Sequence, residues 1–380
     1  MAPRHVLGGA AAALWSSALA IATIERRRAH DPMREEPISI GPLVSIVLPA
    51  RDEARGVGAA VRSHLEQTYR HIEVVVVDDQ STDRTAAAAM DAAMGDERFR
   101  VVDGEPLPDG WVGKSWACWQ GARQAHGEWL LFSDADVVHS PEALSRCLAL
   151  ALRLNRGGLT LTPRVDTKTV GERLVMPAAA TLIENVLAPG FLVRSPRSQI
   201  VMAAGAYMLI RRDVYDRFGG HEGISGHMVD DVALAQAVKR DGGLLVPAIG
   251  ADLIRLRMYH DVPEMWRGWR KNAAFASAGD PSKGLVPAIG LAVLGAAPVI
   301  CVLSGARRRD GRLTALGVAG FAAQCALQRL ASPIVDTPAR YAPTLPVGTT
   351  FMAAAALCGA IDRITGRGPL WRGRRYPDAR

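Results

Sequence analysis

The sequence predicts an α/β protein with a doubly wound, mostly parallel sheet, preceded by one apolar segment and followed by several more. Short apolar runs rich in β-branched residues alternate with helical patterns between residues 44 and 133, which is typical of parallel strands buried on both faces. Acidic side chains follow several of these runs. The flanking apolar segments are almost free of acids, as is typical of chain that meets a membrane.

The N-terminal apolar segment covers residues 6–24, about the length that a membrane-spanning helix needs. A cleaved signal peptide is the alternative, because residues 17–20 resemble a small-residue cleavage site. Three arginines at 26–28 follow directly and favour keeping that side in the cytoplasm. We therefore expect an uncleaved anchor over residues 1–28.

Four strands and three helices are predicted next. The strands are expected at 44–49, 72–77, 99–102 and 129–133, and the helices at 56–67, 85–94 and 115–124. Ser81 and Asp83 precede the second helix and are good N-cap residues. In doubly wound sheets, ligands bind beyond the carboxyl ends of the strands. Polar clusters at 50–53, 78–79 and 134–136 fall at such ends, so we expect the site there.

Two carboxylates two residues apart, Asp134 and Asp136, follow the fourth strand. Oxygen ligands at this spacing suit Mg²⁺ or Mn²⁺ bridging a diphosphate, where the cation would neutralise charge on a departing group. A DxD pattern alone is weak, because acidic pairs often cap helices. Here Pro141 and Glu142 open the next helix, so Asp136 is not needed as its cap.

A second acidic pair, Asp78 and Asp79, ends the second strand and is a candidate for hydrogen bonds to a base or ribose. A turn with a helix cap is the alternative; it explains Asp83 well and Asp78 poorly. Glu53, after the first strand, is open to the similar alternative of a first-turn acid.

These motifs, VSIVLPARDEA, VVVVDDQSTD and GKSWACWQGARQAHGEWLLFSDAD, together resemble the family 2 glycosyltransferases, which have a GT-A fold. The resemblance covers residues 43–272 and implies a donor site for a nucleotide sugar, here a UDP-sugar. It places Asp134 nearer the ribose and Asp136 on the divalent cation. The donor residues that it implies are Pro49, Ala50, Asp52, Glu53, Asp78, Asp79, Lys114 and Asp134.

On the acceptor side, His227 and the pair Asp230-Asp231 resemble the family's acidic motif, with Asp230 where a glutamate is usual. By this resemblance Asp231 is the general base, with Asp230 beside it. The chemistry needs such a base, because an acceptor group must lose its proton as it attacks the anomeric carbon and inverts it. Helix N-terminal acids favoured by the macrodipole are the alternative.

The stretch around Trp269, Arg270 and Lys271 resembles a degenerate form of the family's basic-aromatic motif. The resemblance implies that Arg270 and Lys271 pair with the diphosphate and that Trp269 stacks on the acceptor. A membrane interface belt is the alternative and is compatible with it. The version of the motif found in processive polymer synthases is not present.

Three apolar runs close the chain, at 285–304, 313–331 and 345–361, before a basic tail at 365–380. Buried soluble helices are the alternative to membrane or interfacial ones. Three crossings that start in the cytoplasm would export the arginines at 372–375, against the usual charge bias. These runs and the tail resemble carotenoid-acid and hopanoid-associated glycosyltransferases, which implies a polyisoprenoid-type lipid acceptor.

We therefore expect a glycosyltransferase domain at 43–280 and membrane helices at 285–364, in a multi-pass protein of the inner cell membrane with its catalytic domain in the cytoplasm. Five cysteines show no metal-ligand spacing, and no basic stripe interleaved with aromatics indicates nucleic-acid binding. A nucleotidyltransferase is one rival, but it should show a glycine-rich phosphate loop. A catalytically silent membrane scaffold is another, but it should show a degraded acidic set.

Overall fold

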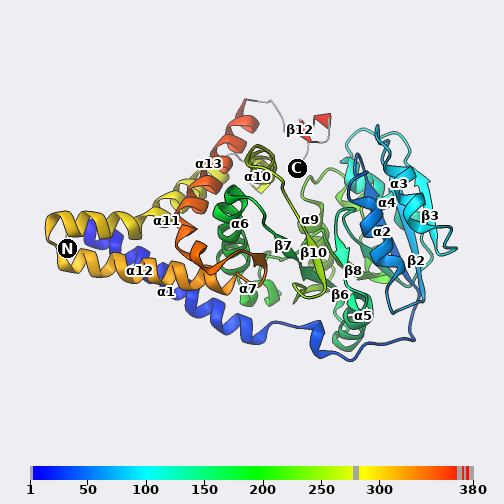
Figure 1. The fold of residues 1–380 in the computed structure, drawn as a ribbon, viewed down its shortest axis with the longest axis horizontal. Helices are drawn as coiled ribbons and strands as arrows, with labels where there is room; N and C mark the ends of the chain where they lie inside the picture. Colours follow the sequence, from blue (N-terminus) through cyan, green and yellow to red (C-terminus); the bar gives the residue numbers. More distant parts are fainter. Residues whose placement is uncertain (1–2, 277–281, 366–369, 372–373, 376–380) are drawn as a thin grey trace. The chain divides into compact units, whose positions relative to one another are not determined.

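The computed structural model describes residues 3–276, 282–365, 370–371 and 374–375 (Figure 1). The chain divides into two compact units. The first comprises Met1–Arg28, Asp166–Phe191 and Met258–Trp371, and the second comprises Ala29–Val165, Leu192–Arg257 and Arg372–Arg380. The end of the predicted glycosyltransferase domain, at residue 280, and most of the predicted basic tail lie outside the described residues.

The second unit contains a seven-stranded sheet with the order β3-β2-β1-β4-β8-β6-β9. These strands are β1 (Val44–Ala50), β2 (Ile72–Asp78), β3 (Phe99–Asp103), β4 (Trp129–Phe132), β6 (Gly157–Thr162), β8 (Met208–Arg211) and β9 (Leu244–Ile249). Neighbouring strands are parallel except at β8, which runs antiparallel to both β4 and β6. The predicted α/β class with a doubly wound, mostly parallel sheet is confirmed, whereas β8 was not predicted.

Three short strands accompany the sheet: β5 (Val138–His139), β7 (Arg164–Asp166) and β10 (Ile254–Leu256). The helices of this unit are η1 (Pro32–Arg34), α2 (Val57–Leu65), α3 (Thr85–Ala93), α4 (Gly113–Gln124), α5 (Ala143–Leu154), α8 (Arg212–Arg217), η3 (Glu222–Ile224) and α9 (Asp230–Arg240). A last strand, β13 (Arg374–Arg375), also belongs to it, and α7 (Gly190–Arg194) crosses the boundary between the units. The four predicted strands and three predicted helices correspond to β1 to β4 and α2 to α4.

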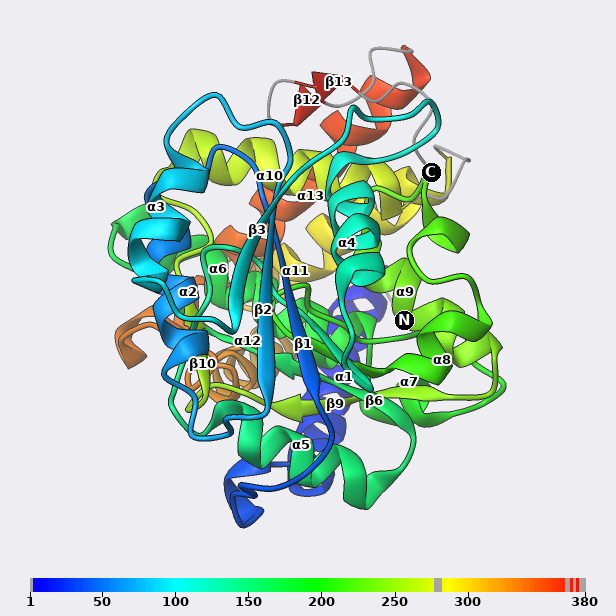
Figure 2. The same ribbon diagram turned by 90° about the vertical axis from the view of Figure 1, so that its right-hand side faces the viewer.

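Helices cover both faces of β1, β2 and β3, with α2 and α3 on one side and α4 on the other (Figure 2). The alternation of side chains along β1 explains this arrangement. Ile46 and Leu48 pack into a core shared with α2 and α3. Val47 points to the opposite face and packs with Cys118 and Ala122 of α4. Because both faces are buried, β1 reads as a continuous apolar run.

The strand register aligns the carboxyl ends of β1, β2 and β4 at one edge of the sheet. Ala50 pairs with Asp78, and Val47 pairs with Phe132, the last residue of β4. The antiparallel β8 begins at Met208, opposite Phe132. The loop that leads into β8 therefore reaches the same edge as the acidic residues that follow the parallel strands.

The first unit consists mainly of helices. They are α1 (Pro3–Arg28), α6 (Val170–Leu182), the π-helix η2 (Ile183–Leu187), α10 (Val262–Ala276), α11 (Ser282–Arg308), α12 (Gly311–Leu330), η4 (Ala339–Thr344) and α13 (Leu345–Ile364). Two short strands, β11 (Val335–Asp336) and β12 (Leu370–Trp371), complete it. α12 packs along both α1 and α11 (Figure 1). At Gly317 of α12, an added Cβ would lie 2.6 Å from the backbone nitrogen of Val302, so a small residue allows the close helix contact.

Three stretches of helix in the described chain are long and apolar enough to cross a membrane: Pro3–Arg28, Leu285–Arg308 and Ala339–Ile364. They coincide with the predicted N-terminal segment and with the first and third of the C-terminal runs. The middle run, α12, does not meet this standard. Its Gln324 and Gln328 are buried and donate to the carbonyls of Gly295 (2.9 Å) and Tyr341 (2.7 Å).

Candidate active site

A lysine and two carboxylates from three different elements meet at the carboxyl edge of the sheet. The Lys114 Nζ atom, in the first turn of α4, lies 2.8 Å from Oδ1 of Asp134 and 3.3 Å from Oδ2 of Asp230. Asp134 follows β4, and Asp230 begins α9. Burial lowers the pKa of Lys114, but these carboxylates and Asp231 outweigh it and raise that pKa well above the ordinary value. Lys114 is therefore a fixed cation.

Asp231 is held by two backbone donors. Its Oδ2 accepts from the Gly205 nitrogen at 3.0 Å and its Oδ1 from the Val232 nitrogen at 2.7 Å. Burial and then the charge of Asp230 raise the pKa of Asp231 to about 6, against the opposing effect of Lys114. A positioned carboxylate whose pKa lies close to the working pH is suited to accept a proton in the reaction.

Gly205 is a residue of this site that the sequence analysis missed. A Cβ added to it would lie 2.7 Å from Nζ of Lys114 and 3.3 Å from Oδ2 of Asp134. The absence of a side chain lets the backbone lie against the ion pair, and a Cβ here would make the Lys114 side chain shift. The sequence does contain a run of small residues at 203–206. This run indicates a close backbone approach only when β8 is known to be antiparallel to β4, because that direction brings the loop before β8 to the carboxyl edge of the sheet.

We expect Gly205→Ala to lower the rate of the sugar transfer that the sequence predicts by about tenfold or more, because the new methyl group would push Nζ of Lys114 away from its carboxylates. Initial rates and the melting temperature of the full chain in detergent would measure the effect. Gly311→Ala is the matched control, since an added Cβ there meets nothing within 4 Å. Wild-type rates in Gly205→Ala would show that the close approach of the Gly205 backbone to Lys114 is not needed for activity.

The acids of the first two motifs also shape the turns that carry them. Oδ1 of Asp52 accepts from the Thr82 nitrogen at 2.8 Å, and Oδ1 of Asp78 accepts from the Ser81 nitrogen at 3.0 Å. The expectation that a turn explains Asp78 poorly is therefore wrong, because the side chain closes the turn after β2. These bonds tie the loops after β1 and β2 into one surface.

The first motif also approaches the DxD pair. The Glu53 nitrogen donates to Oγ1 of Thr85 at 2.8 Å, which fixes the loop after β1. A Cβ added to Gly56 would lie 3.2 Å from Cα of Asp136. The two motifs, about eighty residues apart along the chain, thus meet at the edge where Pro49 and Ala50 end β1.

Asp79, predicted to hold the base, is almost completely buried at 3% exposure. Its carboxylate binds Arg374, with Nη1 2.7 Å from Oδ2 and Nη2 3.2 Å from Oδ1. Arg51 lies farther away, with Nη1 3.8 Å from Oδ2. Burial raises the pKa of Asp79, while the two arginines oppose that rise. The sequence alone predicts Arg374 only as part of a basic tail.

Asp134 and Asp136 are the candidate ligands for a divalent cation. No group of three or more His, Cys, Asp or Glu side chains that could hold a metal occurs in the part of the chain that the structure describes. Mg²⁺ in phosphate-transfer sites commonly binds one or two carboxylates together with substrate phosphates and water. The residues present fit a cation that arrives with a diphosphate better than a preformed metal cage.

His227 lies in the second unit, in the turn before α9, with Nδ1 3.2 Å from the Ile224 carbonyl oxygen. The basic-aromatic residues Trp269, Arg270 and Lys271 lie on α10 of the first unit.

Within the first unit, Arg270 pairs with Asp362 of α13 through two hydrogen bonds of 2.5 Å each. Trp269 is buried, and its ring centroid lies 6.3 Å from that of Tyr259. These contacts give both side chains a structural role. Their contact with diphosphate or acceptor, like that of Lys271, stays a prediction.

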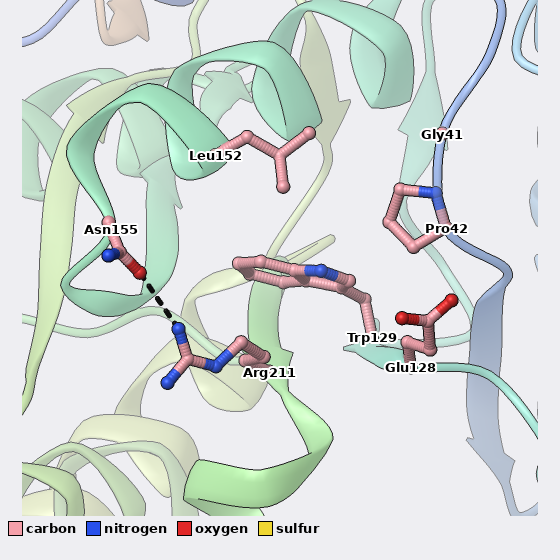
Figure 3. A pocket seen from close by; sticks show the side chains of 7 residues that line it. All are labelled: Gly41, Pro42, Glu128, Trp129, Leu152, Asn155 and Arg211. Carbon is pink, nitrogen blue, oxygen red and sulfur yellow. Dashed lines mark hydrogen bonds between the residues drawn. The ribbon is translucent and has the colours of Figure 1, made fainter.

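A cavity of about 440 Å³ lies at the opposite edge of the sheet (Figure 3). Its lining residues are Gly41, Pro42, Glu128, Trp129, Leu152, Asn155 and Arg211. Trp129 begins β4 and Arg211 ends the antiparallel β8, so both lie away from Asp134. Arg211 donates to Oδ1 of Asn155 at 2.8 Å. No residue predicted for the donor or acceptor lines this cavity, which is therefore separate from the candidate site.

Comparison with known proteins agrees with this geometry. Residues 45–219 match the model of Glycosyl transferase family 2. The 4,4'-diaponeurosporenoate glycosyltransferase of Staphylococcus haemolyticus (strain JCSC1435) is 28% identical over 240 residues, which are 62% of this chain and 62% of that protein. The corresponding protein of Staphylococcus aureus (strain MRSA252) is 28% identical over 244 residues, 63% of each chain. The match thus spans less than two thirds of these relatives.

Among solved structures, the mannosyltransferase PcManGT from Pyrobaculum calidifontis, in complex with GDP-Man and Mn²⁺, is similar with a TM-score of 0.54. It is 18% identical, and the match covers 94% of this chain and 99% of that one. The predicted GT-A fold is confirmed, as is the predicted resemblance to family 2 and to carotenoid-acid glycosyltransferases.

Proposed function

We propose that this chain, which matches the family 2 glycosyltransferase model over residues 45–219, is an inverting hexosyltransferase. Its donor is a nucleotide sugar, here a UDP-sugar, and its acceptor is a polyisoprenoid-type lipid of the carotenoid or hopanoid kind. The reaction takes place at the cytoplasmic face of the cell membrane. One observation carries the proposal: Lys114, Asp134 and Asp231 lie together at the carboxyl edge of one sheet, although they come from distant parts of the chain.

Asp231 acts as the general base. Its carboxylate takes the proton from a hydroxyl or carboxyl group of the acceptor as the acceptor oxygen bonds to the anomeric carbon. The bond from that carbon to the diphosphate breaks at the same time, and the nucleoside diphosphate leaves with the electron pair. Attack from the face opposite the leaving group inverts the anomeric configuration. Gly205 and Val232 hold the carboxylate in place for this step.

Lys114 supplies a fixed positive charge beside Asp134, where charge on the leaving diphosphate is stabilised. Asp134 binds the ribose, and Asp134 and Asp136 would hold the divalent cation, which would neutralise part of the diphosphate charge. Glu53 and Asp79 hold the nucleoside, with Asp52, Asp78 and the end of β1 shaping the loops around it.

The lipid acceptor is supported by two features. The staphylococcal relatives are named for a carotenoid acid. In this chain, α11 leaves large apolar side chains exposed, among them Val286 at 73% and Leu303 at 66%. Side chains of this kind over an apolar helix are typical of a surface that meets lipid.

The test is a transfer assay with the full chain in lipid nanodiscs. Tritiated UDP-glucose or GDP-mannose would be supplied with 4,4'-diaponeurosporenoate and Mn²⁺, and lipid products would be identified by mass spectrometry. We expect a glycosylated lipid, free nucleoside diphosphate, loss of activity with EDTA and recovery with added Mn²⁺. In parallel, titration calorimetry with UDP and with GDP should give heat that depends on Mn²⁺.

Two results would contradict the proposal. Release of pyrophosphate from a nucleoside triphosphate and a sugar 1-phosphate would identify a nucleotidyltransferase. Absence of any metal-dependent heat with either nucleotide would identify a scaffold without catalytic function.

A further inference from the structure

We propose that Arg374 is a positioning residue of the donor site. Its guanidinium holds the Asp79 carboxylate ionised and oriented for the nucleobase. This inference rests on the proposed function. It assigns a role to the C-terminal segment, whose arginines otherwise read only as a basic tail.

Arg374 and Asp79 form a bidentate ion pair rather than a single salt bridge at the surface. Both terminal nitrogens of the Arg374 guanidinium meet the two oxygens of Asp79, at 2.7 and 3.2 Å. Nη2 also donates to Oε1 of Gln80 at 3.1 Å, which fixes the plane of the guanidinium. Paired bonds of this kind to a carboxylate are stronger and more directional than a single ionic contact. The two side chains are 17% and 5% exposed, so solvent screens them little.

The carboxylate needs this partner because of where the sheet places it. Asp79 follows β2, its backbone nitrogen donates to the Ala50 carbonyl at 2.8 Å, and the residue is only 3% exposed, so the main chain is tied to the end of β1 and the carboxylate is buried. A buried carboxylate without a partner gains a proton instead of keeping its charge. A protonated Asp79 would no longer be purely an acceptor for an N–H group of a base.

Arg51 does not replace Arg374 in this role. Its Nη1 lies 3.8 Å from Oδ2 of Asp79, and it donates instead to the backbone carbonyl of Asp79 at 2.5 Å. Arg51 therefore anchors the main chain, whereas Arg374 binds the carboxylate itself. The two arginines have separable roles at one residue.

The backbone conformation of Gln80 lets its side chain bind Arg374. Its φ of 57° lies in the left-handed region, which is uncommon for residues other than glycine. In this conformation the side-chain oxygen reaches Arg374. The turn after β2 thus presents a carboxylate and an amide oxygen side by side to one guanidinium.

The test uses the full chain in nanodiscs, with steady-state transfer kinetics and titration calorimetry of UDP and GDP in the presence of Mn²⁺. We expect Arg374→Ala to raise the donor KM and the nucleotide Kd by about tenfold or more, with the acceptor KM unchanged and kcat changed far less. Arg374→Lys, which keeps the charge but not the paired geometry, should recover part of the loss. In an Asp79→Asn background, Arg374→Ala should have little further effect, because both changes act on one contact.

Arg84→Ala is the matched control: it also removes one positive charge from the same unit, but its side chain is 83% exposed. It should leave donor and acceptor constants as in the wild type. If Arg374→Ala binds nucleotide as tightly as the wild type, or more tightly, the arginine does not position Asp79 for the donor, and the inference is overturned. Effects that add fully to Asp79→Asn would also overturn it. A wild-type chain that binds neither nucleotide would instead overturn the proposed function, and this inference with it.

Discussion

Asp231→Asn is expected to lower kcat by about 10²- to 10⁴-fold, the usual contribution of a positioned general base. The amide cannot take up the acceptor proton, although its size is nearly that of the carboxylate. For the wild type, the pKa of about 6 at Asp231 gives the direction of the pH dependence. A general base is active only when deprotonated, so with Asp231 in the proposed role the rate should rise as pH increases through about 6 and level off above it.

The measurement is single-turnover transfer between pH 5 and 8, with nucleotide affinity determined separately. Asp241→Asn is the matched control, because Asp241 lies at the other end of α9 and pairs with Arg217 at 2.7 Å. The control should retain wild-type activity. Nearly normal turnover in Asp231→Asn, or a wild-type rate that does not change with pH in this range, would exclude Asp231 as the base.

Lys114→Met is expected to lower kcat/KM by about 10²- to 10³-fold, as for the loss of one fixed donor to developing charge. It should also move the rising limb of the pH profile upwards. The reason is that the positive charge of Lys114 lowers the pKa of Asp231, so its removal leaves the Val232 hydrogen bond to oppose burial and carboxylate repulsion, and the pKa rises further.

Rates for this variant are compared with those of Lys168→Met, which removes an exposed lysine elsewhere in the chain. The control should show neither effect. A Lys114→Met protein with reduced rate but an unchanged pH profile would mean that Lys114 does not act on Asp231 in the working enzyme.

Local patterns predicted the first half of the sheet because its strands are buried on both faces and end in polar clusters. β1 and β2 appear in the sequence as nearly unbroken apolar runs, and their observed bounds differ little from the predicted ones. β8 is only four residues long, and its antiparallel direction depends on tertiary pairing with β4 and β6. Nothing in so short a run specifies that direction.

The site residues also divide into those that local patterns predict and those that depend on tertiary contacts. The acids could be predicted because each ends a recognisable strand or begins a helix. Gly205 could not, because its importance depends on the approach of Lys114 across three elements. Arg374 could not, because it contacts Asp79 across 295 positions of sequence. Gln324 interrupts an apolar run of the sequence, yet its side chain is fully buried.

The bond between Arg374 and Asp79 also constrains how the chain can thread a bilayer. A residue that touches the sheet must lie on the same side of the membrane as the sheet. In a chain that spans a membrane, the number of crossings between Arg257, the last residue of the second unit before the helices, and Arg374 would therefore be even. Zero or two crossings by α11, α12 and α13 would satisfy this parity and three would not, so the expected cytoplasmic side of the C-terminal arginines agrees with this bond.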